Sequence, residues 1–241
     1  MAGTAVLRRL TWRPATIIEV VTETDQARTL LLDVPGWPGH RAGQHVDVRL
    51  TADDGYQATR AYSLATAPGE TPALTVVRAP SGEVSPYLVD VAGTGDQVEV
   101  RGPIGGYFVW EPTPERRPLL LVAGGSGVVP LRSMLRHRER LRDGTPVRMI
   151  YSVRDPGQII YRDELEAADG EVTFVYTRSA PTDWPEPVGR VDRSQLARLV
   201  WPPAHGPVAY VCGPTAFVEH VAQILTILGY PHTDIRTERY G

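Results

Sequence analysis

One glycine-rich stretch of the sequence could bind a phosphate group. Residues 119–135, LLLVAGGSGVVPLRSML, pass from an apolar run through Gly124, Gly125 and Gly127 into a helical pattern with Pro130 near its start. Glycine lets the backbone approach an anion closely, and the free amides at a helix N-terminus attract one. The spacing matches neither GxGxxG nor GxxxxGK. A tight structural turn that needs positive φ is therefore the alternative.

A second stretch, Cys212-Gly213-Pro214, also joins an apolar run to a helical one. The residues alone favour a buried cysteine that is followed by an ordinary helix start. Cys212 is the single cysteine of the chain. It excludes an internal disulfide, an iron–sulfur cluster held by four thiolates and a cysteine-rich zinc site.

The first half of the chain offers a guanidinium next to a phenol. In RAYS, strand alternation puts Arg60 and Tyr62 on one face, with Ser63 opposite or at a bend. Such a pair could hold a phosphate and stack on a planar ring, although by itself RAYS is better explained as an ordinary strand. In GEVSPYL, Gly82 allows close approach, and we expect Ser85 to cap a short helix that begins at Pro86.

Hydrophobic periodicity predicts two kinds of element around these residues. Six β-rich runs and one short helix, at 85–92, predict an N-terminal six-stranded antiparallel β-barrel or sandwich. Five later strands alternate with four helices, which predicts a C-terminal α/β domain with a five-stranded parallel sheet. The predicted strands are 14–24, 27–34, 45–51, 58–66, 73–79, 96–102, 117–123, 147–153, 171–177, 208–213 and 233–240, and the later helices are 130–143, 161–169, 192–200 and 214–229.

The proline-rich, charged segment EPTPERRP, residues 111–118, is the natural linker between these halves. We therefore predict two domains, 1–113 and 114–241. Ligands of open parallel sheets bind beyond the carboxyl ends of the strands. The glycine-rich stretch and Cys212-Gly213-Pro214 are both expected at that edge.

Composition narrows the class of protein. The net charge of −3 does not favour nucleic acid or an anionic membrane as the main partner. All 25 basic residues are arginine, which excludes lysine-based Schiff-base chemistry. The N-terminal residues lack the apolar core of a signal peptide and no run is long enough for a membrane span, so we expect a cytoplasmic protein. His40, His45 and His137 show no metal-ligand spacing and are expected to be polar surface residues; no metal site is predicted.

Several of these motifs together, in this order, resemble the ferredoxin–NADP reductase superfamily across nearly the whole chain. The resemblance implies an FAD-binding β-barrel domain followed by an NAD(P)-binding α/β domain. It implies an oxidoreductase that moves hydride from NAD(P)H to the flavin, and then electrons to a separate acceptor such as a ferredoxin or an oxygenase component. The stretches that carry it are RAYSLATAP, VVRAPSGEVSPYL, GDQVEVRGPIGGYF, LLLVAGGSGVVPLRSML, YVCGPTAFV and the terminal ERYG.

The resemblance also implies roles for individual residues. On the flavin side, Arg60 would pair with the FAD phosphate, Tyr62 would stack on the ring and Ser63 would hydrogen-bond near N5. The aromatic residue that stacks on adenine is open among Tyr107, Phe108 and Trp110. The remaining flavin contacts implied are Val77, Arg78, Gly82, Val84 and Ser85.

On the nicotinamide side, the resemblance places the pyrophosphate on the glycine-rich stretch and the nicotinamide ring beside Cys212. Glu238 and Tyr240 would be the acid and the aromatic residue placed against the flavin. Tyr62, Ser63 and Cys212 complete the candidate catalytic residues. The implied nucleotide contacts are Gly124, Gly125, Ser126, Gly127, Cys212, Gly213 and Pro214.

Three arginines could recognise the 2′-phosphate that distinguishes NADPH from NADH. They are Arg154, Arg178 and Arg190, which end or follow predicted strands. We favour NADPH on this ground, although relatives that use NADH carry similar pairs.

Alternatives to this function are a reductase of free flavin or small acceptors, and a flavin-binding electron-transfer subunit without nicotinamide activity. The intact GGSG and CGP stretches argue against the last. We expect a monomer. The helix LRSMLRHRERLRDG could dock an acidic ferredoxin, but a solvated amphipathic helix is the favoured interpretation. Its arginines are Arg132, Arg136, Arg138, Arg140 and Arg142.

Overall fold

The computed structural model describes residues 10–168 and 172–240, and its first sheet has six antiparallel strands in the order β4-β3-β6-β1-β2-β5. Residues 1–9, 169–171 and 241, which include parts of the predicted domains, of strand 171–177 and of helix 161–169, lie outside the described residues. The strands are β1 (Trp12–Thr24), β2 (Ala27–Asp33), β3 (His45–Thr51), β4 (Gln57–Ser63), β5 (Ala73–Val77) and β6 (Gln97–Ile104).

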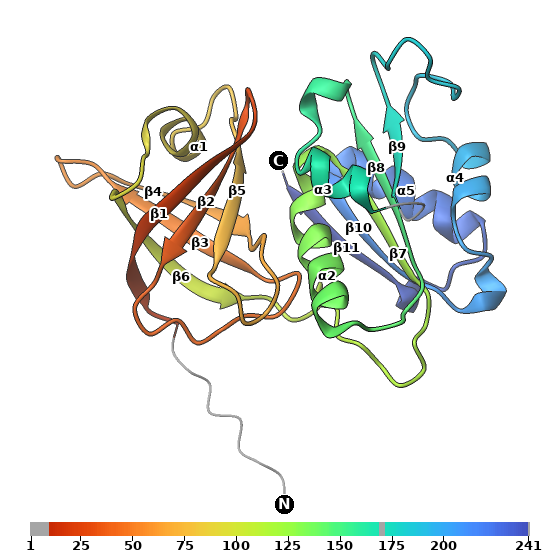
Figure 1. Cartoon of the computed structure of the whole chain (residues 1–241), viewed down its shortest axis with the longest axis horizontal. Helices are drawn as coiled ribbons and strands as arrows, with labels where there is room; N and C mark the ends of the chain where they lie inside the picture. Colours follow the sequence, from red (N-terminus) through yellow and green to blue (C-terminus); the bar gives the residue numbers. More distant parts are fainter. Residues whose placement is uncertain (1–9, 169–171, 241) are drawn as a thin grey trace, which may run out of the picture.

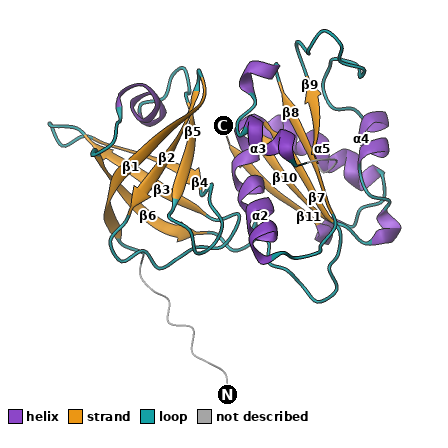
Figure 2. Ribbon diagram, viewed as in Figure 1, coloured by secondary structure: helices purple, strands orange, loops and turns teal. Residues whose placement is uncertain are grey.

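Alternation of apolar and polar residues explains why this sheet curls around a core. Along β3, Val46 and Val48 are buried, while the residues between and beside them are partly exposed. A bridge between Leu64 and Leu74 joins the chain just after β4 to β5, so the two edges of the sheet meet. The predicted antiparallel barrel is confirmed (Figure 2).

The short helix of the barrel differs from the prediction at its start. It consists of α1 (Val84–Pro86) followed by a π-helical turn, Tyr87–Val91. Glu83 is the N-cap residue and makes no side-chain cap, whereas Ser85 lies inside the helix and its Oγ accepts from the Ala79 amide at 3.0 Å. The expected cap by Ser85 and the expected start at Pro86 are therefore wrong, because Ser85 instead ties the preceding loop to the helix.

The second sheet has five parallel strands in the order β11-β10-β7-β8-β9 (Figure 1). The predicted parallel α/β domain is thus confirmed. Its strands are β7 (Leu119–Gly124), β8 (Val147–Val153), β9 (Val172–Tyr176), β10 (Val208–Pro214) and β11 (Ile235–Tyr240), and its helices are α2 (Val128–Leu141), α3 (Arg162–Ala167), α4 (Arg193–Leu199) and α5 (Thr215–Ile227). The predicted boundary between residues 113 and 114 falls in the linker between β6 and β7.

One hydrophobic core runs across the two domains. Residues of β7, α2 and α3 pack with barrel residues such as Ala42 and Ala65, while α4 and α5 cover the opposite face of the parallel sheet in a separate cluster. At Gly43, a Cβ would lie 2.1 Å from the Phe108 carbonyl oxygen and 2.6 Å from a Met134 carbon. The barrel therefore sits directly against α2, and this packing orients the two sheets.

Two of the three histidines expected at the surface are buried. His40 and His137 are each 7% exposed, because both lie between the barrel and α2, and His45 is partly buried. Burial lowers the pKa of His40 and of His45. Among residues 10–168 and 172–240, no group of three or more His, Cys, Asp or Glu side chains could hold a metal ion. No helix of the described chain is long and apolar enough to cross a membrane.

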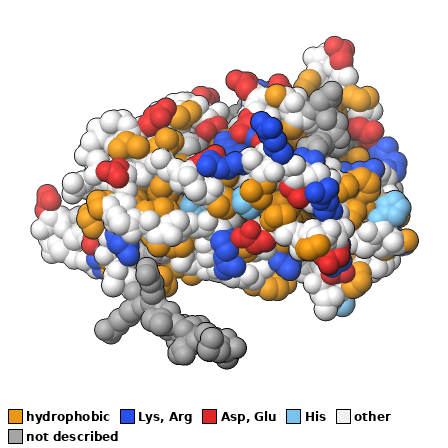
Figure 3. Space-filling model, turned by 60° about the horizontal axis from the view of Figure 1, so that its bottom comes forward, with side chains coloured by type: hydrophobic (Ala, Val, Ile, Leu, Met, Phe, Trp, Pro, Cys, Tyr) orange, Lys and Arg blue, Asp and Glu red, His pale blue; other side chains and the backbone are white. Residues whose placement is uncertain are grey.

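The arginine-rich helix α2 is neither a free basic surface nor a simply solvated one. The Arg132 side chain is 3% exposed and pairs with Glu139 and Glu164. Arg136 also pairs with Glu164, and Arg140 pairs with Glu70 of the barrel at 3.2 Å. Arginine and acidic side chains lie interspersed on the face in Figure 3. Both interpretations of this helix are wrong for its inward-facing arginines, because tertiary contacts place carboxylates opposite them.

Candidate functional site

A cavity of about 460 Å³ lies between the barrel and the carboxyl ends of β10 and β11. Its barrel wall includes Arg60, Tyr62 and Ser63 from β4, together with Val84 and Ser85 from α1. The Arg60 guanidinium donates to the Thr59 carbonyl at 2.7 Å, and within the described residues no carboxylate pairs with it. The wall thus combines an uncompensated cation with a partly buried phenol ring. The other predicted residues that line this cavity are Val77 and Gly82 from the barrel and Ser126, Cys212, Glu238 and Tyr240 from the parallel-sheet domain.

A hydrogen bond crosses this cavity from one domain to the other. Ser63 Oγ donates to Glu238 Oε1 at 3.2 Å. Burial raises the pKa of Glu238 to about 7, and the bond from Ser63 acts in the opposite direction. Burial likewise raises the pKa of Tyr62 to about 12, so its hydroxyl stays protonated. The cavity therefore contains a carboxyl group that can gain or lose a proton near neutral pH.

Strand register brings Cys212 and Glu238 side by side. Cys212 pairs with Glu238 across β10 and β11, and with Ala123 across β10 and β7. The thiol is 2% exposed, and its burial raises its pKa. A protonated, buried thiol is a poor nucleophile, so Cys212 is suited to contact a ligand rather than to attack one.

A second cavity, of about 570 Å³, adjoins the first. The glycine-rich turn forms part of its wall, where a 3-10 turn, Gly125–Gly127, leads into α2. Val77, Ser126 and Tyr240 line both cavities. The Tyr240 hydroxyl donates to the Gly124 carbonyl oxygen at 2.5 Å, and burial raises its pKa to about 12. The C-terminal tyrosine thus separates the two cavities. The other predicted residues on the second wall are Arg78, Gly124, Gly125, Arg154 and Pro214.

Two of the predicted glycines line neither cavity. A Cβ on Gly127 would lie 2.1 Å from the Cys212 carbonyl oxygen, and one on Gly213 would lie 2.8 Å from the Phe217 ring and 3.2 Å from Gly124 backbone atoms. These glycines are required because the end of β10 packs closely against the end of β7 and the glycine-rich turn that follows it. Gly125 differs, since it has a φ of +54° and lies on the cavity wall.

The arginines expected to choose the coenzyme occupy different positions. Arg154 is exposed on the wall of the second cavity. Arg178 and Arg190 are exposed residues outside both walls, although the Arg178 amide donates to the Arg154 carbonyl oxygen at 2.9 Å. Arg78 lines the second cavity, but its charge is paired with Asp90 at 2.6 Å. Arg154 is therefore the best placed of the three to meet a ligand phosphate.

The aromatic residues left open for adenine are not on either wall. Phe108 and Trp110 are 5% and 7% exposed and belong to the core between the domains. Tyr107 is 64% exposed and its hydroxyl donates to the Ile235 carbonyl oxygen at 3.3 Å. The tertiary structure thus makes Phe108 and Trp110 core residues.

Several residues that line the two cavities belong to no motif that sequence analysis could recognise. The first cavity also contains His45, Thr75 and Arg239, and the second contains Gln158 and Ile160. Each comes from a strand or loop whose own sequence is ordinary, so only the fold places it there. Another cavity, of about 590 Å³ around Tyr56 and Glu83 on the barrel, contains none of the predicted site residues.

The residues present fit a dinucleotide pair on physical grounds. Each cavity is within the range of roughly 300–1,000 Å³ that is usual for small-molecule sites. Arg60 in one wall and Arg154 in the other are cations without a carboxylate partner in the described chain. Gly125 and Ser126, in the turn just before α2, lie on the second wall next to the Tyr240 hydroxyl, so an anion would reach their backbone once Tyr240 moves. The walls meet at Tyr240, so ligands in the two cavities would touch there.

Comparison with known families matches each half of the chain to a domain family. Residues 14–109 match the oxidoreductase FAD-binding domain, and residues 121–223 match the oxidoreductase NAD-binding domain. The chain is 30% identical over 232 residues to a 3-ketosteroid-9-alpha-monooxygenase ferredoxin reductase component from Rhodococcus rhodochrous, with 94% of this chain and 64% of that protein covered. It is 30% identical to a flavohemoprotein from Pseudomonas aeruginosa, covering 91% of this chain and 56% of that protein. The chain thus spans about two thirds or less of these relatives.

Solved structures show the same arrangement of domains. A cytochrome P450 reductase from Amycolatopsis superposes with a TM-score of 0.80 and 26% identity, covering 98% of this chain and 73% of that one. The flavohem-like FAD/NAD-binding domain of a nitric oxide dioxygenase from Vibrio cholerae gives a TM-score of 0.82 at 23% identity, covering 95% and 98% of the two chains. At that identity the second likeness shows a shared fold.

Proposed function

Because the chain belongs to the ferredoxin–NADP reductase superfamily, with its FAD-binding and NAD-binding domains in order, we propose that it is an FAD-dependent NAD(P)H oxidoreductase that passes electrons to a separate acceptor protein. The observation that carries this proposal is the shared wall of the two cavities at Val77, Ser126 and Tyr240. Two ligands that must exchange a hydride have to lie in contact, and adjoining cavities allow it.

The residues of the first cavity would hold FAD. When bound, FAD accepts a hydride and can release electrons one at a time. Arg60 would pair with its phosphate, and the Tyr62 ring would cover its flat ring system, since both residues line this cavity. Ser63 Oγ can donate toward a ring nitrogen, and the bond from Ser63 to Glu238 shows that this hydroxyl can reach across the cavity.

The residues of the second cavity would hold the nicotinamide nucleotide. The backbone of Gly125 and Ser126 would receive the pyrophosphate, and Pro214 would border the ring. Tyr240 lies where the two cavities meet, so its ring must move aside before two planar ligands stack there. Glu238 can hold or release a proton at its Oε atoms near neutral pH, because burial raises its pKa to about 7.

We further propose that NADPH is preferred over NADH, with Arg154 as the main contact of the 2′-phosphate and Arg178 beside it. The acceptor is proposed to be a ferredoxin or an oxygenase component, which is supported by relatives named as ferredoxin reductase and electron transfer components of oxygenases. The compartment and the monomeric state expected from the sequence stay predictions.

The visible spectrum of the purified protein tests this function directly. We expect flavin absorbance that is retained through gel filtration and is bleached by NADPH or NADH without oxygen. A colourless protein that does not take up added FAD would refute the proposal. A bound flavin that neither coenzyme reduces would instead indicate a binding subunit. Assays with ferredoxin, cytochrome c, ferricyanide and free FMN would then rank the acceptors.

A further inference from the structure

Tyr161 belongs to the parallel-sheet domain but is buried against the barrel. It is 5% exposed and directly precedes α3. Its φ of +59° lies in the left-handed region, which is unfavourable for a non-glycine residue. Surrounding contacts must therefore hold it in this conformation.

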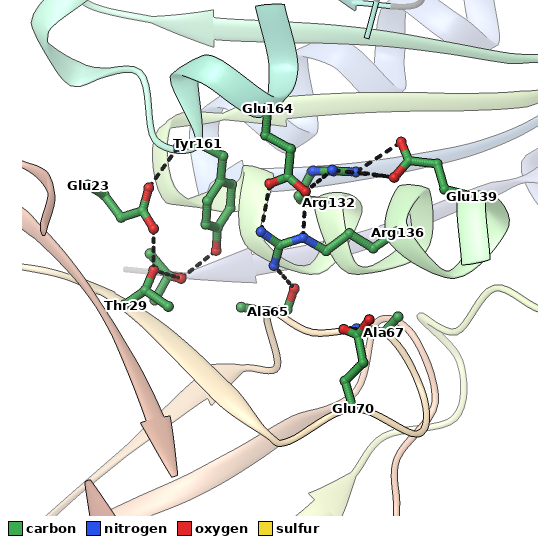
Figure 4. Close-up of polar contacts among 11 residues, drawn as sticks. Glu23, Thr29, Ala65, Ala67, Glu70, Arg132, Arg136, Glu139, Tyr161 and Glu164 are labelled. Carbon is green, nitrogen blue, oxygen red and sulfur yellow. Dashed lines mark hydrogen bonds and ion pairs between the residues drawn. The ribbon is translucent and has the colours of Figure 1, made fainter. Parts of the chain in front are cut away.

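A closed ring of hydrogen bonds joins Tyr161 to two strands of the barrel and the end of a third (Figure 4). The Tyr161 hydroxyl bonds to Thr75 Oγ1, and Thr75 Oγ1 lies 2.7 Å from Thr29 Oγ1. Thr29 Oγ1 donates to Glu23 Oε1 at 2.6 Å, and Glu23 Oε2 accepts from the Tyr161 amide at 3.1 Å. The bonds thus run from the side chain of Tyr161 through β5, β2 and β1 back to its own backbone.

The carboxylate sets the direction of this ring. Thr29 has a single hydroxyl proton, and it donates this proton to Glu23. Thr75 then donates to Thr29, and the Tyr161 hydroxyl donates to Thr75. Burial raises the pKa of Tyr161, which keeps its hydroxyl protonated for this role. Removing one hydroxyl would leave buried partners unsatisfied along the ring.

A second set of contacts fastens Tyr161 to the loop after β4. The Arg136 guanidinium lies 4.9 Å from the centre of the Tyr161 ring and pairs with Glu164 at 2.6 Å. Arg136 also donates to the Ala65 carbonyl oxygen at 2.7 Å, two residues beyond Ser63. Arg136 therefore links Tyr161 to the loop that follows the strand carrying the flavin-side residues.

The residues next to these contacts line the two cavities. We call the lining of the first cavity the flavin-side wall and that of the second cavity the nucleotide-side wall. Gln158 and Ile160, just before Tyr161, lie on the nucleotide-side wall. Thr75 lies on the flavin-side wall, and Val77 lies on both. A displacement of Tyr161 would thus move one wall relative to the other.

We propose that Tyr161 is a positioning residue: through its ring of hydrogen bonds with Thr75, Thr29 and Glu23 it sets how closely the nicotinamide nucleotide approaches the flavin. The effect of Tyr161 on the reaction rests on the proposed function. The effect of Tyr161 on the loop 154–161 follows from the contacts alone. A shift of about 1 Å between reacting atoms can slow a reaction by up to about a hundredfold.

The test compares Tyr161→Phe with Tyr230→Phe in the purified protein. Tyr230 is a matched control, because its buried hydroxyl donates to the Trp201 carbonyl oxygen at 2.7 Å within the parallel-sheet domain and its residue lines neither cavity. We expect Tyr161→Phe to slow anaerobic flavin reduction at saturating coenzyme by about tenfold, with coenzyme affinity changed less than about twofold. We expect Tyr230→Phe to lower thermal stability and leave that rate unchanged.

Hydrogen–deuterium exchange gives a readout that does not need activity. Amides of residues 154–161 should exchange faster in Tyr161→Phe and in Thr29→Val, but not in Tyr230→Phe. Thr29 lines neither cavity, so Thr29→Val breaks the ring without touching a ligand wall. The double variant Tyr161→Phe/Thr29→Val should be no slower in flavin reduction than the slower single variant, because both changes break one chain of bonds.

Unchanged reduction and unchanged exchange in Tyr161→Phe would overturn the proposal. So would equal slowing by Tyr161→Phe and Tyr230→Phe, which would indicate general destabilisation. A wild-type protein that neither coenzyme reduces would refute the proposed function, and the exchange comparison would still decide whether Tyr161 holds the loop.

Discussion

Ser63 and Glu238, which are 175 positions apart in the chain, are joined by a hydrogen bond of 3.2 Å from the serine hydroxyl to the glutamate Oε1. One residue ends a barrel strand and the other lies on the edge strand of the parallel sheet. This bond spans the cavity in which we propose that FAD binds. It therefore identifies a site that neither domain could form alone.

Glu238→Gln should change how stability depends on pH in the cofactor-free protein. Burial raises the pKa of Glu238 from 4.5 to about 7, so the folded state favours its protonated form. That stabilisation is complete below about pH 4.5 and is lost as the pH rises through about 7. Relative to the variant, the wild type should lose about 3 kcal/mol of unfolding free energy over this range. Urea unfolding at pH 5 and pH 8 measures the unfolding free energy of both proteins. If it changes with pH by the same amount in the wild type and the variant, the raised pKa of Glu238 is contradicted.

Gly127→Ala should destabilise the fold rather than weaken coenzyme binding alone. The added Cβ would lie 2.1 Å from the Cys212 carbonyl oxygen, so β10 and the glycine-rich turn would have to separate. We expect a loss of about 3 kcal/mol in unfolding free energy. Gly189→Ala is the control, because a Cβ there meets nothing within 4 Å. Urea denaturation measures the unfolding free energy of both variants. Equal values would show that β10 and the glycine-rich turn can move apart at little cost.

Arg60→Ala should reduce retention of FAD. Arg60 is a cation on the flavin-side wall without a carboxylate partner in the described chain, and a hydrogen bond to a charged group contributes about 1.5–3 kcal/mol. The dissociation constant for FAD should rise by about ten- to a hundredfold. Arg101→Ala removes a barrel arginine that pairs with Asp47 outside both cavities, and it should leave this constant unchanged. Fluorescence titration with FAD distinguishes the two variants.

Arg154→Ala should raise the KM for NADPH and leave the KM for NADH almost unchanged. Because Arg154 lies on the nucleotide-side wall, loss of its pairing with the 2′-phosphate should raise the KM for NADPH by about tenfold. The KM for NADH should stay within about twofold. Arg178→Ala should shift the same ratio in the same direction but less, because Arg178 lies outside the wall. Steady-state kinetics with both coenzymes would expose a wrong assignment if the two KM values rose together.

Periodicity and local chemistry were enough to predict both sheets and much of the two cavity walls. The alternation around Val46 and Val48 predicts a strand of a half-buried antiparallel sheet, and the apolar run before Gly124 predicts a buried parallel one. Both signals depend on neighbours in the chain. The resemblance was carried by motifs such as RAYS and GGSG, whose backbone and side-chain chemistry is also local.

Only the tertiary structure could decide which residues face one another. It paired Arg132 and Arg136 with Glu164, placed Gly127 against Cys212, and buried Tyr161 against the barrel. Each relationship joins separate segments through close packing, and its energy depends on geometry that no stretch of sequence contains. The sequence by itself determined what kinds of surface this protein has, whereas the packing of two domains determined which of those surfaces form one site.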